Sequence, residues 1–154
     1  MPNRRPVTDG LIYVPTVAST AYTDGDLLYL NSGVATLASS QADQSSESAN
    51  QALLADNFLG VAAGNKLASD GSTGELAVSI DGEYEYPCDS GNWAVGEFVT
   101  GCEQSNGTQL ENQKVKKTST RADAIGVCIK AGTSITKVRF ILWSRFNKPL
   151  TQGA

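Results

Sequence analysis

The sequence predicts a mostly β protein, with a single compact antiparallel β-barrel or β-sandwich domain and an extended N-terminal arm. The chain has 154 residues, enough for one domain with a core of its own. Apolar residues make up 40% of the chain and charged residues 18%, as in ordinary globular proteins. Short apolar runs alternate with turn residues, and the many Ser, Thr, Gly and Asn residues suit strands joined by turns.

Three segments are expected: an arm over residues 1–10, the β domain over 11–146 and a C-terminal tail over 147–154. The arm holds two prolines, Arg4 and Arg5 and little to bury, so we expect it to be loose or laid on a neighbour. No stretch approaches the roughly 20 apolar residues of a membrane helix, and the N-terminus lacks the apolar run of a signal peptide. We therefore expect no membrane partner and folding in a cytosol.

The first strands are indicated by β-rich runs between turns. Residues 11–18 are interrupted by Pro15, which favours an edge strand. The runs 27–30 and 34–38 flank an Asn-Ser-Gly turn and predict a hairpin.

A polar segment interrupts the β pattern after this hairpin. Residues 39–56 are small and polar and predict a long Ser-rich surface loop with at most a short helix, capped by Ser48. A strand over 58–63 and a polar connection over 65–74 follow.

Residues 75–86 predict one long amphipathic strand. Its apolar positions all have the same parity: Leu76, Val78, Ile80, Tyr84 and Tyr86. A two-residue hairpin at Asp81-Gly82 would switch that parity. We therefore expect Gly82 to mark a bend or a close approach within one strand.

The second half repeats the pattern of strands and turns. We expect a strand over 93–101, a hairpin turn at Asn106-Gly107 and a strand over 110–117. A strand over 124–131 and a final strand over about 135–146 complete the domain.

The final strand has two different faces. Val138, Phe140, Leu142 and Phe146 fall on one side, which we expect to be core. The other side is a basic face that carries a tryptophan: Lys137, Arg139, Trp143 and Arg145.

An internal echo links the two halves. The run 25–28 before one hairpin resembles 96–99 before another, and 59–62 resembles 125–128 further along. The two spacings differ because the intervening loops differ. Two pseudo-equivalent β units that close on one core would explain the echo, and a chance similarity of short β motifs is the alternative.

The sequence shows no catalytic apparatus, and we expect neither an enzyme nor a bound cofactor. It has no histidine, so it cannot form a Ser-His-Asp or Cys-His arrangement. No phosphate-binding glycine motif occurs. Asp81, Glu83 and Glu85 alternate on one strand face, where they could act as an acid/base pair with another strand or simply as solvating charge.

Three isolated cysteines, Cys88, Cys102 and Cys128, have no metal-site spacing. We expect three buried, reduced thiols. A bridge between Cys88 and Cys102, or a reactive or intermolecular thiol, is the alternative.

Charge is distributed unevenly along the chain. Residues 1–113 hold 3 basic and 15 acidic side chains, whereas residues 114–154 hold 9 basic and 1 acidic. This asymmetry favours contacts between unlike patches, unless strands from the two halves interleave and the charges mix. Nucleic acid is not the expected partner, because the protein as a whole is acidic. Trp and Arg anchor protein interfaces, although Trp143 could also pack under the 39–56 loop.

The order of motifs resembles that of the capsid cement, or head decoration, proteins of tailed bacteriophages. The motifs are G-D-L-L, F-L-G-V-A, the acidic-Gly strand E-L-A-V-S-I-D-G-E-Y-E-Y-P, W-A-V-G-E-F-V and A-I-G-V-C, spread over residues 22–142. The resemblance implies a small β-barrel virion protein without catalytic residues, assembled in the host cytoplasm and bound to the capsid exterior. It implies the major capsid protein as partner and self-association, often as a homotrimer. The Ser-rich loop and the basic C-terminal segment depart from that pattern.

The residues expected at contacts are Arg4 and Arg5 in the arm and Arg139, Trp143 and Arg145 on the final strand. The alternative function is a non-catalytic carbohydrate- or receptor-binding module of a virion or surface protein. Such a module would use exposed aromatic side chains near polar loops, for which Tyr13, Tyr22 and Trp93 are the candidates.

Overall fold

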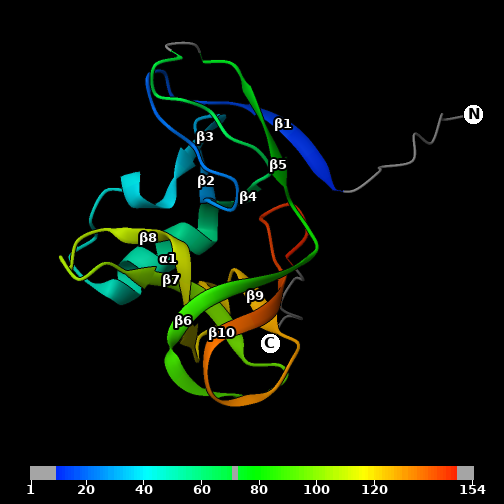
Figure 1. The fold of residues 1–154 in the computed structure, drawn as a ribbon. Helices are drawn as coiled ribbons and strands as arrows, with labels where there is room; N and C mark the ends of the chain where they lie inside the picture. Colours follow the sequence, from blue (N-terminus) through cyan, green and yellow to red (C-terminus); the bar gives the residue numbers. More distant parts are fainter. Residues whose placement is uncertain (1–9, 71–72, 149–154) are drawn as a thin grey trace, which may run out of the picture.

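The chain folds into two antiparallel five-stranded sheets that follow one another along the sequence (Figure 1). The computed structural model describes residues 10–70 and 73–148, so Arg4, Arg5 and most of the predicted arm and tail lie outside it. In chain order the elements are β1 (Leu11–Pro15), β2 (Leu27–Asn31), β3 (Val34–Leu37), η1 (Ala38–Ser40), α1 (Glu47–Asn57), β4 (Phe58–Ala62), β5 (Glu75–Ser79), β6 (Glu83–Trp93), β7 (Phe98–Glu103), β8 (Leu110–Thr118), η2 (Arg121–Asp123), β9 (Gly126–Cys128) and β10 (Gly132–Leu142). The predicted mostly β class is confirmed.

The first unit, residues 10–80, contains a sheet of order β1-β5-β4-β2-β3. Its two edges approach each other, because Thr16 beyond β1 forms a parallel bridge with Ala35 in β3. The sheet therefore curls around its own apolar cluster. The buried members of this cluster are Val14, Tyr22, Leu28, Ala35, Leu59, Ala62, Leu76 and Val78.

The second unit, residues 82–148, contains a sheet of order β6-β10-β9-β7-β8. Its edges also approach each other, since Lys114 of β8 lies 2.7 Å from the Asp89 carboxylate of β6. The cluster inside this sheet also takes in side chains of the first unit, namely Leu27, Ala38, Leu54, Ala55, Phe58 and Val61. The two units therefore pack directly against each other through this cluster. They do not close on a single core, because the first unit also has a separate cluster of its own.

The two sheets have the same topology, with strands β1–β5 corresponding to β6–β10. The registers also correspond: Leu27↔Val61 and Leu28↔Gly60 in the first unit, Phe98↔Val127 and Val99↔Gly126 in the second. The predicted echo is thus confirmed as two pseudo-equivalent β units, and the prediction that they close on one core is wrong.

Hydrogen bonds outside the strand ladders repeat as well. The Gly25 N–H donates to the Ala62 carbonyl at 2.8 Å, and the Gly96 N–H donates to the Cys128 carbonyl at 2.8 Å. The sequence also repeats at the start of each unit: Asp9-Gly10 to Pro15 has the same spacing as Asp81-Gly82 to Pro87. Both glycines have positive φ, +53° and +107°, and each immediately precedes the first strand of its unit.

The predicted long strand over 75–86 is divided in two. β5 ends at Ser79 and belongs to the first sheet, whereas β6 begins at Glu83 and belongs to the second. The prediction that Asp81-Gly82 forms no hairpin is confirmed, because β5 does not pair with β6. Gly82 allows the chain to pass from one sheet to the other at its positive φ.

The segment 39–56 is not a long loop with at most a short helix. α1 has 11 residues, and its N-cap is Ser46, whose hydroxyl accepts from the Ala49 N–H at 3.2 Å, not the predicted Ser48. α1 lies against both units and buries Leu54 and Ala55. Within the part of the chain that the structure describes, no helix has the length and apolar character needed to cross a bilayer.

Strand boundaries in the second unit differ from several predictions. The Asn106-Gly107 turn does join the antiparallel strands β7 and β8. Trp93 ends β6 instead of opening the next strand, and β9 spans only three residues. β10 ends at Leu142, so the predicted core residue Phe146 lies in a turn and is 56% exposed.

Candidate interaction surface

The described residues hold no group of three or more His, Cys, Asp or Glu side chains that could bind a metal ion. Cys88, Cys102 and Cys128 are all buried and free, so the alternative bridge between Cys88 and Cys102 is absent. Burial raises the pKa of the Cys88 and Cys102 thiols, which disfavours the reactive thiolate. The Glu85 carboxylate, one of the three alternating acids, lies 3.7 Å from the Arg139 guanidinium.

The predicted basic face is only partly assembled. Arg139 is exposed on β10, and Trp143 continues the strand pairing through an N–H that donates to the Ile125 carbonyl at 2.7 Å. Arg145 follows the end of β10, in the turn where its N–H donates to the Phe58 carbonyl at 2.8 Å. Arg139 and Trp143 therefore belong to one strand face, and Arg145 does not.

An apolar row crosses the outer face of the second sheet. Phe98, Val127 and Ile141 are direct neighbours on β7, β9 and β10. Phe98 and Val127 are half-buried and Ile141 is 40% exposed, whereas the residues that alternate with them face the core. We call these three residues the outer row.

Trp143 extends the outer row at one end. Its ring centroid lies 6.0 Å from that of Phe98, with an angle of 48° between the planes. The Arg121 guanidinium lies over the indole at 5.0 Å from the centroid, within cation–π range. Trp143 is half-buried, and both of these contacts come from the second unit. Its exposure is therefore intermediate between the two predicted alternatives, an exposed interface residue and a residue covered by the 39–56 loop.

The corresponding row of the first unit is covered. Its members are Leu27, Val61 and Ser79, and Leu27 and Val61 are 0% and 3% exposed. Both side chains pack into the cluster that includes Tyr86 of the second unit. The same surface is therefore buried in one unit and uncovered in the other.

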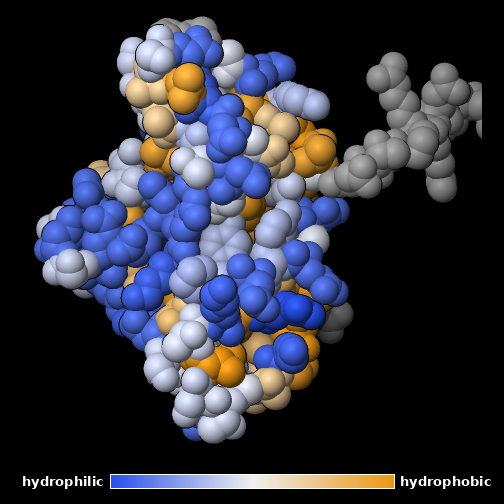
Figure 2. All heavy atoms as spheres, in the orientation of Figure 1, coloured by the Kyte–Doolittle hydropathy of each residue, from blue (hydrophilic) through white to orange (hydrophobic). Residues whose placement is uncertain are grey.

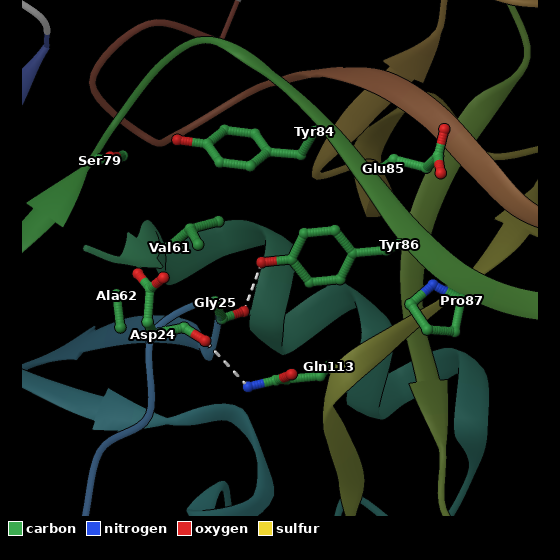
Figure 3. A pocket seen from close by; sticks show the side chains of 10 residues that line it. All are labelled: Asp24, Gly25, Val61, Ala62, Ser79, Tyr84, Glu85, Tyr86, Pro87 and Gln113. Carbon is green, nitrogen blue, oxygen red and sulfur yellow. Dashed lines mark hydrogen bonds between the residues drawn. The ribbon is translucent and has the colours of Figure 1, made fainter. Parts of the chain in front are cut away.

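A cleft of about 260 Å³ lies between the units and is lined by Tyr84, Tyr86 and Gln113 from one side and Asp24 and Gly25 from the other (Figure 3). Its polar groups already bind each other. The Tyr86 hydroxyl donates to the Gly25 carbonyl, and the Gln113 amide donates to the Asp24 carbonyl at 3.2 Å. Burial raises the pKa of Tyr86, which keeps this donor protonated. These hydrogen bonds join the two units across the cleft.

Charge is unevenly distributed over the fold. The basic run at residues 114–117 is largely neutralised, because Lys114, Lys116 and Lys117 pair with Asp89, Glu47 and Glu97. Residues 129–148, which we call the basic segment, hold five basic and no acidic side chains. Residues 10–80 of the first unit hold seven acidic side chains and one basic one. The charges of the two halves therefore mix only in part.

Two of the three aromatic residues expected for glycan binding are buried. Tyr22 is 2% exposed and its hydroxyl donates to the Ala35 carbonyl at 2.7 Å, and Trp93 is 5% exposed. Tyr13 on β1 is 65% exposed, as that prediction required. Figure 2 shows hydrophilic side chains over α1 and the β7–β8 hairpin, and hydrophobic surface beside β1 and near the end of the second unit.

A comparison with protein-family models finds no family that matches the chain, and a search of curated proteins finds no matching sequence.

Proposed function

We propose that this protein is a virion structural protein that decorates the outside of a tailed-phage capsid and stabilises it. Its partners in this proposal are the major capsid protein and further copies of itself. The motifs that resemble decoration proteins occupy corresponding strands of the two β units, which supports the proposal.

The observation that carries the proposal is the uncovered outer row beside the basic segment. A partly exposed isoleucine, an aromatic pair and an overlying arginine form the kind of surface that binds proteins, since aromatic residues and Arg anchor interfaces. Binding is thus the activity that this surface supports best.

The carbohydrate-binding alternative is weaker after the burial of Tyr22 and Trp93. A glycan platform requires exposed aromatic faces, and these rings are enclosed in the two apolar clusters.

Co-sedimentation with undecorated phage capsids tests the proposal. We expect the full chain to sediment with the particles, and Ile141→Asp to lose most of this binding, because it places a charge within the outer row. Ala42→Asp is the matched control, since Ala42 is exposed in the loop that precedes α1. A full chain that stays in the supernatant with every capsid tried would refute decoration. Equal binding by both variants would refute the role of the row.

A further inference from the structure

We infer that the outer row of the second unit binds the first unit of a second copy of this chain, at the exposed face of β1. The contact is head-to-tail and joins unlike surfaces. The inference rests on the proposed function for its biological setting, and it names the partner of the same surface. Its test uses free protein without capsids, so it stands or fails independently of capsid binding.

The equivalent rows of the two units differ in their cover. In the first unit, Leu27 and Val61 pack into a cluster formed by α1 of the same unit and by side chains of the second unit, among them Tyr86 of β6. In the second unit the equivalent row, with Ile141 40% exposed, has no such cover among the described residues. A surface that one unit buries against the next is therefore left open at the end of the pair.

The exposed face of β1 offers an apolar surface that could cover the outer row. Leu11 is 38% exposed there and Tyr13 is 65% exposed. The outer row and this face of β1 are both open in one chain, and a second copy can bring them together.

The two surfaces belong to parts of the chain with opposite net charge. The first unit carries a net charge of −6 over residues 10–80, from seven acidic side chains and one lysine. The basic segment beside the outer row carries +5. Opposite charges steer the two surfaces together, and like charges oppose contact between two identical basic faces.

A contact between unlike surfaces is heterologous. It closes into a ring when the rotation between neighbours permits, and otherwise continues into an open chain. An isologous dimer through two outer rows would instead bring two basic segments together. The two arrangements differ in which residues of neighbouring chains meet.

Cross-linking between single-cysteine variants tests the arrangement. Tyr13→Cys and Ile141→Cys chains, one isotopically labelled, are mixed and treated with a short bismaleimide linker. The three native cysteines are buried, and untreated wild type reports any background. We expect products that join the two unlike variants. Ala42→Cys mixed with Ile141→Cys is the matched control and should give none.

Ile141→Cys chains that cross-link mainly to each other would overturn the inference in favour of an isologous contact. The absence of any product above the control would also overturn it. Sedimentation of the free protein gives a second test, in which self-association weakens as salt rises from about 50 mM to about 500 mM. A wild-type chain that stays monomeric at low salt and high concentration would contradict the inference, whatever the capsid assay shows.

Discussion

Gly126→Ala tests whether the two β units depend on the same close approach of strands. Gly126 lies on β9 next to β10, and a Cβ atom at this position would lie 2.5 Å from a Phe140 ring carbon and 2.6 Å from the Ile141 carbonyl oxygen. Side-chain carbons essentially never come within 3.0 Å of such atoms. The two strands must therefore separate by about half an ångström, which disturbs the short pairing of β9.

The expected cost follows from overpacking in a buried site. Forced separation of packed elements destabilises proteins by about 1–3 kcal/mol. For a chain of this length, each kcal/mol lowers Tm by about 2–4 °C, so we expect a loss of about 2–12 °C. Gly60 is the equivalent position of the first unit, where the added Cβ would meet the Ser79 carbonyl oxygen still more closely. We expect Gly60→Ala to lower Tm at least as much.

Thermal unfolding followed by circular dichroism measures these effects. The control is Gly91→Ala on β6, where the nearest atom to the new Cβ is 3.8 Å away. We expect this variant to change stability by less than about 0.5 kcal/mol. If Gly126→Ala or Gly60→Ala melts together with Gly91→Ala, the proposed equivalence of the two close approaches is refuted.

Three further predictions concern the helix cap, the contact between the units and an ion pair. Ser46→Ala should lower the unfolding free energy by about 0.5–2 kcal/mol in urea, and Ser48→Ala should not, because only Ser46 caps α1. Tyr86→Phe should cost about 1 kcal/mol in the same assay, since it removes a hydrogen bond between the units; an unchanged midpoint would contradict this. The hydrogen bond from Lys117 lowers the pKa of Glu97 in the folded protein. The ionised Glu97 carboxylate therefore stabilises the fold fully above the pKa of the unfolded chain, and this contribution is lost as the pH falls through the lower pKa of the folded state. Melting curves at decreasing pH should show a smaller acid-induced loss for Glu97→Gln than for wild type.

Local patterns predicted the features that depend on local chemistry. The Asn106-Gly107 turn was predicted correctly because a hairpin turn needs residues that accept positive φ, and Gly107 has a φ of +74°. The buried face of β10 was also predicted correctly, because Val138 and Phe140 are fully buried. Alternation with a period of two is fixed by strand geometry alone.

α1 escaped prediction because it is held by tertiary contacts of polar side chains. Asn50 is buried, and its amide donates to Asp43 and to Glu103, each at 3.1 Å. Gln51 is also buried and donates to the Gly101 carbonyl at 2.9 Å. All of these partners lie outside the helix. Because α1 is held by polar side chains, its sequence shows no apolar stripe and has the composition of a loop.

The candidate surface was predictable only in part for a similar reason. Arg139 and Trp143 were correctly placed on one face by parity, whereas Phe98 and Val127 join them only through the pairing of β9 with β7 and β10. The strand end after Leu142 moved Arg145 and Phe146 off the predicted faces. Strand order and strand ends are set by tertiary contacts, which parity within one strand does not report.

The equivalent positions of the two units differ in a way that burial alone does not explain. Ser79 is half-buried at the edge of the cleft, and Ile141 occupies the equivalent position in the second unit. If water were the final environment of the outer row, a polar residue would be expected at the position of Ile141 as well. An isoleucine 40% exposed beside the aromatic pair of Phe98 and Trp143 is instead expected if the row is covered by another molecule.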